Sequence, residues 1–129
     1  FTGTLTDWKD AGGSGGPIEV VSREDGSDAR LAFDATILNG QMSVTTSVVM
    51  PGDDLMSDYV ARTPSAVGYG WLPYLGHDVK TIVVDHALLS TMPVQALTDK
   101  EPNGQLRKWL AWVQTDGQSG MPLGFEPLP

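Results

Sequence analysis

The residues of this chain that are best suited to chemistry lie in one short run, residues 22–30 (SREDGSDAR). The run places Arg23, a glycine turn at Gly26 and Ser27 between an apolar segment and a segment with helical spacing. The start of a helix carries unpaired backbone N–H groups and a partial positive charge, so it favours a small bound oxyanion. The run also contains Asp28, a carboxylate that repels an anion. It therefore indicates either an anion-binding loop or a helix start that Asp28 stabilises without any ligand.

Side chains and backbone groups of this loop can supply the donors that a phosphate-like ion requires. Burying such an ion is costly unless its oxygens are paired. Arg23 offers a planar fork of N–H donors, and Ser27 offers a hydroxyl and its backbone N–H. The backbone N–H groups of Asp28 and Ala29 are expected to complete the nest.

Three neighbouring residues are expected to support the loop. Asp25, two residues after Arg23, is placed to hold the guanidinium in orientation. Gly26 provides the sharp turn. Arg30 lies one turn into the helix, where its side chain is expected to reach the same anion-binding loop.

Other candidate residues lack the neighbours that a site requires. His77 and His86 each stand beside an aspartate, but no third ligand follows at metal-binding spacing. Ser90 and Ser119 have no nucleophile-elbow context. The glycine-rich run at 11–17 lacks the Lys-Ser/Thr ending of a nucleotide-binding loop and fits a connector. We therefore expect no catalytic residue, no metal and no cofactor, and no enzyme activity.

The composition sets further limits. A chain of 129 residues with 40% hydrophobic and 19% charged residues fits one domain, residues 1–129. The net charge of −8 argues against nucleic acid or an anionic membrane as partner. The absence of cysteine excludes disulfides. The chain begins at Phe1 rather than at methionine, which is typical of a trimmed piece of a longer protein.

The elements that must position the loop alternate along the chain, which predicts an α/β fold. The expected strands are 18–22, 43–50, 66–71, 79–84 and 93–98. The expected helices are the end of one within 1–10, then 28–38 capped by Ser27, 52–64 and 103–115. The apolar residues expected to be buried by the last two helices are Leu55, Met56, Tyr59 and Val60, then Leu106, Trp109, Leu110 and Val113.

The order of these segments resembles the second lobe of phosphate-type periplasmic solute-binding proteins, the substrate-capturing components of ABC importers. Four stretches carry the resemblance. They are FTGTLTDW at 1–8, REDGS at 23–27, RTPSAVGY at 62–69 and GFEPLP at 124–129. Each motif alone has low specificity, but all four occur in the family's order and spacing across nearly the whole chain.

The resemblance implies an α/β fold, namely a single lobe of the type II periplasmic binding protein fold with a mixed sheet flanked by helices. It gives Arg23 and Ser27 the family's anion-binding roles. It also implies phosphate or a related oxyanion as ligand, an ABC permease as partner, and a periplasmic or extracytoplasmic location, with a lipoprotein as one full-length form. The family's Gly-Thr pair after the serine is replaced here by Asp28 and Ala29, so a degenerate lobe with a structural, sensory or protein-interaction role remains the alternative.

Solute-binding proteins of this type hold the ligand between two lobes, and the first lobe is absent from this sequence. The final helix, with Trp109 and Trp112, is expected to pack partly against that lobe. We therefore expect an exposed apolar face, weak ligand affinity of this chain alone, and a homodimer through that face.

Overall fold

The computed structural model describes residues 1–82, 84, 98–122 and 125. The chain divides into two compact units, Phe1–Thr91 and Met92–Pro129, and each is described by itself. Within the described residues, no helix has both the length and the apolar character needed to cross a membrane.

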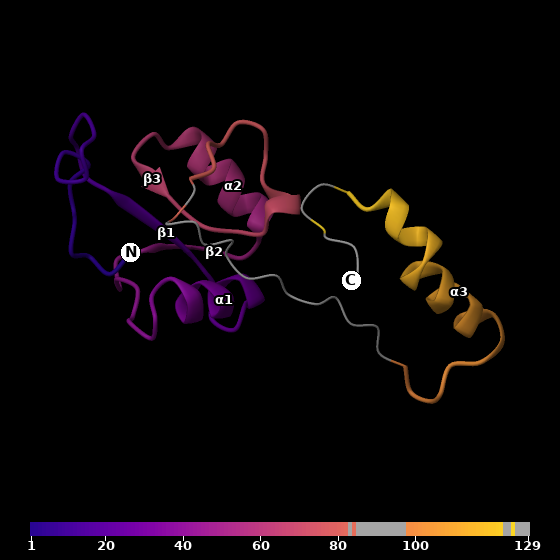
Figure 1. The fold of residues 1–129 in the computed structure, drawn as a ribbon. Coiled ribbons are helices and arrows are strands. Elements are labelled where there is room, and N and C mark those ends of the chain that lie inside the picture. Colours follow the sequence, from indigo (N-terminus) through magenta and orange to yellow (C-terminus); the bar gives the residue numbers. More distant parts are fainter. Residues whose placement is uncertain (83, 85–97, 123–124, 126–129) are drawn as a thin grey trace. The chain divides into compact units, whose positions relative to one another are not determined.

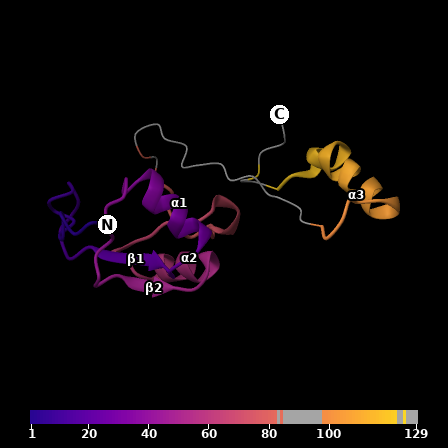
Figure 2. The same ribbon diagram turned by 90° about the horizontal axis from the view of Figure 1, so that it is seen from below.

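The first unit is built on a three-stranded parallel sheet. Strand β1 (Glu19–Arg23) lies in the centre, between β2 (Val48–Met50) and β3 (Ala66–Val67). Val21 stands opposite Val48, and Glu19 stands opposite Ala66. Figure 2 shows β1 and β2 side by side and pointing the same way. One isolated antiparallel bridge, between Asp7 and Pro17, precedes the sheet.

Two helices cover the sheet. The chain passes from β1 through α1 (Asp28–Thr36) to β2, and then through α2 (Asp53–Arg62) back across β1 to β3. The two crossovers run in opposite directions along the sheet, so right-handed connections place the helices on opposite faces. Figure 1 shows α1 and α2 on opposite sides of the strands. The α/β fold predicted from the sequence is therefore confirmed.

The core of this unit surrounds β1. Val21 and Met56 are almost fully buried, at 0% and 1% exposure. On the side of α1, Phe33 stacks flat against Tyr69, with ring centroids 4.0 Å apart, and Phe1 meets both rings edge-on. Because β1 is covered on both faces, even its polar residues Ser22 and Arg23 are buried.

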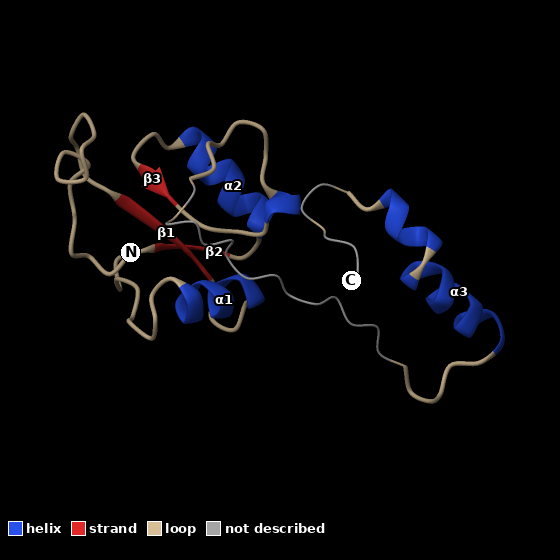
Figure 3. Cartoon of the chain, in the orientation of Figure 1, coloured by secondary structure: helices blue, strands red, loops and turns tan. Residues whose placement is uncertain are grey.

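The predicted elements of this unit are mostly present but shorter. Strand β1 is shifted by one residue from 18–22, and β2 and β3 keep only parts of 43–50 and 66–71. Helix α1 ends at Thr36 rather than at residue 38, before Asn39 and Gly40 with positive φ. Figure 3 shows the helices in blue, the strands in red and the connecting loops in tan.

Three expectations for this unit are wrong. Residues 1–10 form turns and a bridge rather than the end of a helix. Residues 79–82 carry no strand, and Val84 forms only an isolated bridge. Leu55 is 48% exposed, because it lies on the outer side of α2 while Met56 and Ser57 face inward. The expected strand at 93–98 lies, except for Thr98, outside the described residues.

The second unit contains α3 (Gly104–Gln114), followed by a 3-10 turn, η2 (Asp116–Gly120). The helix was expected at 103–115 and is confirmed. Its expected buried face is not: no residue of α3 is buried, and Trp109 and Trp112 are 55% and 53% exposed. Within this unit, α3 packs against η2.

Candidate functional site

The loop after β1 is shaped by a turn and a capped helix. The backbone N–H of Ser27 donates to the carbonyl of Glu24 at 3.2 Å, and Gly26 takes the left-handed φ of +82° that this turn requires. The Ser27 hydroxyl then accepts the N–H of Arg30 at 3.1 Å. Ser27 is thus the N-cap of α1, as the sequence predicted.

Arg23 is the central charge of the site. It is only 6% exposed, although arginine is rarely buried without partners. Its Nε donates to Glu24 at 2.9 Å and to the carbonyl of Met50 at 3.2 Å, and its Nη2 donates to Glu24 at 3.1 Å. Its Nη1 is paired with the carboxylate of Asp53, whose side chain is 10% exposed.

The pairing shifts the ionisation of both partners. The hydrogen bond to Glu24, together with the nearby charge of Asp53, raises the pKa of Arg23 despite its burial. The hydrogen bond from Arg23 lowers the pKa of Glu24 below its ordinary value. Arg23 therefore remains charged, in an environment that contains more negative than positive groups.

Asp25 does not orient Arg23, and this expectation is corrected. Its carboxylate pairs instead with Arg30, at 2.7 Å, and is 93% exposed. Arg30 also donates from Nη1 to the carbonyl of Arg23 at 3.0 Å. Arg30 thus bonds to both ends of the turn, at Arg23 and Asp25. Of the two acidic residues after Arg23, only Glu24 pairs with the guanidinium of Arg23.

Asp28 interacts with the helix start itself. Its carboxylate, on an exposed residue, accepts the backbone N–H of Ala29 at 2.8 Å. Ala29 is one of the residues whose backbone N–H was expected to meet the anion. A ligand at this position must therefore compete with a carboxylate of the chain for that donor.

Sequence reasoning missed Glu24, Asp53 and Tyr69. Tyr69 places its hydroxyl 2.9 Å from the Ser22 hydroxyl and 3.2 Å from the N–H of Arg23. A signal for Asp53 was present: it follows the end of β2, and in an open parallel sheet the carboxyl ends of neighbouring strands share one edge. Arg23 and Met50 are register partners, which places Asp53 beside the guanidinium.

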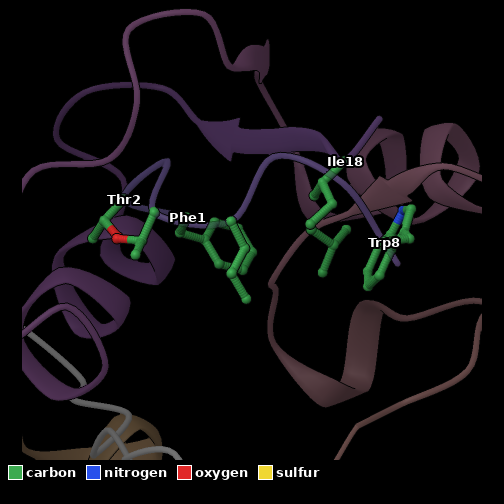
Figure 4. A pocket seen from close by; sticks show the side chains of 7 residues that line it. Phe1, Thr2, Trp8 and Ile18 are labelled. Atoms are coloured by element: carbon green, nitrogen blue, oxygen red, sulfur yellow. The ribbon is translucent and has the colours of Figure 1, made fainter. Parts of the chain in front are cut away.

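The apolar pocket in Figure 4 is separate from this loop. It has a volume of about 260 Å³ and is lined by residues of the N-terminal segment together with Ile18 and Val67. None of the loop residues 23–30 lines it. His77 lies exposed in a turn, whereas His86 and Ser90 lie outside the described residues.

Comparison with known proteins decides the family. A family model described as "PBP superfamily domain" matches residues 1–84, more than half of the chain. The chain belongs to this family. Its first three motifs, at 1–8, 23–27 and 62–69, lie within the matched part of the PBP superfamily domain, whereas the fourth, at 124–129, lies almost wholly outside the described residues.

Relatives of this PBP superfamily domain include phosphate-binding proteins. The phosphate-binding protein PstS of Bacillus subtilis is 32% identical over 81 residues, which cover 63% of this chain and 27% of that protein. An ABC-type phosphate transport receptor from Vibrio cholerae superposes with a TM-score of 0.62 and 28% identity, covering 70% of this chain and 38% of the receptor.

A putative phosphate ABC transporter substrate-binding protein from Clostridium perfringens, solved with bound phosphate, gives a TM-score of 0.72. It is 25% identical, and the match covers 92% of this chain and 55% of that one. The chain thus spans only part of the length of each of these relatives. The resemblance to phosphate-type solute-binding proteins and the single-lobe α/β fold are confirmed.

Proposed function

We propose that this chain is one lobe of an extracytoplasmic solute-binding protein and that it holds phosphate or a related small oxyanion for an ABC-type uptake system. The observation that carries the proposal is Arg23, a buried cation at the carboxyl end of the central strand, directly before a helix start. This edge of an open α/β sheet is where ligands bind. The similarity to phosphate-binding relatives supports phosphate as the first solute to test.

Arg23 retains donors for a ligand. A guanidinium has five N–H groups. In the described part of the chain, Glu24, Met50 and Asp53 engage Nε–H, one N–H of Nη1 and one of Nη2. One N–H on each terminal nitrogen therefore has no partner among the described residues, so Arg23 can still donate charge-assisted hydrogen bonds to an oxyanion. Ser27 and the N–H of Asp28 lie in the same loop, and Ala29 joins them if Asp28 turns away.

A degenerate lobe is the competing function, and two observations favour it. The N–H of Ala29 is already bonded to Asp28, and Arg23 is already paired with two carboxylates. In that case the domain serves as a structural, sensory or protein-interaction module without phosphate binding.

Titration of the protein with phosphate, sulfate, molybdate and small carboxylates, by calorimetry and thermal shift, separates the two functions. Binding stabilises the folded state, by about 2.7 kcal/mol at a ligand concentration of one hundred times Kd. We expect stabilisation by phosphate that is lost in Arg23→Ala and kept in Arg62→Ala, a matched variant whose side chain is 80% exposed. Arg23→Lys provides a second variant that keeps the buried charge if Arg23→Ala does not fold.

Asp28→Gly tests the degenerate lobe directly. No response of the wild-type protein to any of these anions, together with a response gained in Asp28→Gly, would establish that the site has been lost. A phosphate response in the wild type that Asp28→Gly only strengthens would support the binding function.

The proposed partners follow from the same function. A binding lobe of this kind acts with an ABC permease in the periplasm or at the outer surface of the cell, and it closes on its solute together with a second lobe. The exposed Trp109 and Trp112 of α3 are candidates for contact with that lobe or with a second copy of the chain. Light scattering across a concentration series tests the homodimer, and a monomer at the highest concentration rejects it.

A further inference from the structure

Asp53 contacts the candidate anion site from a different element than the loop itself. It is the first residue of α2, whereas Arg23 ends β1, and the two are 30 residues apart in sequence. Both side chains are nearly excluded from solvent, with 10% and 7% exposure. A charged pair this buried interacts more strongly than a surface pair, because water screens it less.

The second carboxylate on Arg23, that of Glu24, is in a different environment. Its side chain is 40% exposed and belongs to the neighbouring residue in sequence. Solvent screens this contact, and an exposed pair contributes little to holding a side chain in place. Of the two carboxylates, Asp53 is therefore the one that fixes the guanidinium relative to the sheet.

The surroundings of Asp53 leave room for its carboxylate. Gly70 faces it so closely that a Cβ atom at position 70 would lie 3.2 Å from Oδ1 of Asp53. The glycine thus permits the approach of Asp53 to Arg23. The charge pair is built from three segments: the end of β1, the start of α2 and the chain after β3.

We propose that Asp53 is a positioning residue for the oxyanion: it holds Nη1 of Arg23 so that the remaining N–H groups are presented to the ligand in one orientation. This inference rests on the proposed function. A guanidinium that is already fixed in its binding orientation loses less side-chain entropy when the ligand binds, and the smaller entropy loss raises the affinity.

A competing role for Asp53 would give the opposite experimental result. If Asp53 occupies the place of the ligand on Arg23, its removal frees the guanidinium and tightens binding. Positioning and competition therefore predict changes of opposite sign in Kd for the same substitution.

The test is Asp53→Asn in the full-length protein, with phosphate affinity measured by calorimetry well below the melting temperature. We expect Kd to rise about tenfold to hundredfold, by analogy with metal sites, where loss of the hydrogen-bond partner of a ligating side chain weakens binding by that factor. Asp54→Asn is the matched control, because Asp54 has the same charge in the same first turn of α2 but is exposed, and among the described residues its side chain accepts a hydrogen bond only from the N–H of Leu55. Its Kd is expected to stay within about twofold, since surface changes are typically worth no more than about 0.5 kcal/mol.

Two further variants keep the proposal testable. Asp53→Glu, which restores the carboxylate, is expected to recover part of the affinity, a readout that a purely structural role does not move. Gly70→Ala crowds the Asp53 carboxylate without removing its charge, and it is expected to weaken phosphate binding. It provides the test if Asp53→Asn does not fold.

The failures are distinguishable. A wild-type protein that binds none of the titrated anions overturns the proposed function and this inference with it. A wild-type protein that binds, together with an Asp53→Asn variant of equal or tighter affinity, overturns the positioning role alone.

Discussion

The hydroxyl of Tyr69 accepts the backbone N–H of Arg23 at 3.2 Å, although 46 residues separate them in sequence. The same hydroxyl lies 2.9 Å from the Ser22 hydroxyl, and the Tyr69 ring stacks on Phe33 of α1. One side chain therefore connects the last two residues of the central strand to helix α1.

Replacement of Tyr69 by phenylalanine tests this connection. The stacking on Phe33 is retained, but the buried N–H of Arg23 loses its partner, which costs about 1–3 kcal/mol of unfolding free energy. Urea denaturation measures the loss. Tyr74→Phe is the control, because Tyr74 is 57% exposed, and its effect is expected within about 0.5 kcal/mol. Equal midpoints for the two variants would contradict the assigned role.

Met56 fills the space between α2 and the sheet. It is 1% exposed, and Met56→Ala leaves a cavity that costs about 2–5 kcal/mol of unfolding free energy. Met42→Ala is the matched control, because Met42 is 83% exposed. Thermal unfolding of both variants gives the comparison, and a similar melting temperature for the two would show that α2 does not pack as described.

The Glu24–Arg23 pair predicts a dependence of stability on acid. The pKa of Glu24 is lowered in the folded state by its hydrogen bond to Arg23, so the pair stabilises the protein above the ordinary pKa of 4.5. This contribution is lost as the pH falls through the folded-state pKa. Urea denaturation between neutral pH and the acid range is expected to show a smaller fall in Glu24→Gln than in the wild type. A parallel fall in both proteins would rule out the contribution.

Tyr59 predicts a dependence at alkaline pH. Its hydroxyl donates to the Glu19 carboxylate, and this hydrogen bond raises the pKa of Tyr59 above its ordinary 10.0. The contribution to stability is present below pH 10 and is lost as the pH rises through the folded-state pKa. Ultraviolet titration of tyrosinate is expected to show Tyr59 ionising above its ordinary pKa, and Glu19→Gln is expected to bring that pKa back toward 10. An unchanged curve in Glu19→Gln would break the assignment.

Local patterns predicted the framework of the first unit well. The β-branched run before Arg23 gave the central strand, Ser27 gave the cap of α1, and the acids after Gly52 gave the start of α2. Such signals act between near neighbours in sequence, so they are readable without the fold.

Ion pairs between residues that are distant in sequence could not be predicted from such local signals. The sequence placed Asp25 next to Arg23, but the turn at Gly26 sends Asp25 outward and leaves the guanidinium to Glu24 and Asp53. The choice depends on the register of β1 and β2. The apolar face of α3 was also misjudged, because helical periodicity shows which face is apolar but not what covers it.

The order of strands in the sheet has a consequence for how the protein folds. The central strand is the earliest in the chain, and its two neighbours come later: Val21 pairs with Val48, and Glu19 with Ala66. Non-local pairings of this kind must overcome loop-closure entropy before they gain stabilising contacts. Arg23 is therefore synthesised well before Asp53 and Tyr69, its later partners in an ion pair and a hydrogen bond. The loop at residues 24–27 is made early on the ribosome but acquires its final shape only when both later strands have docked.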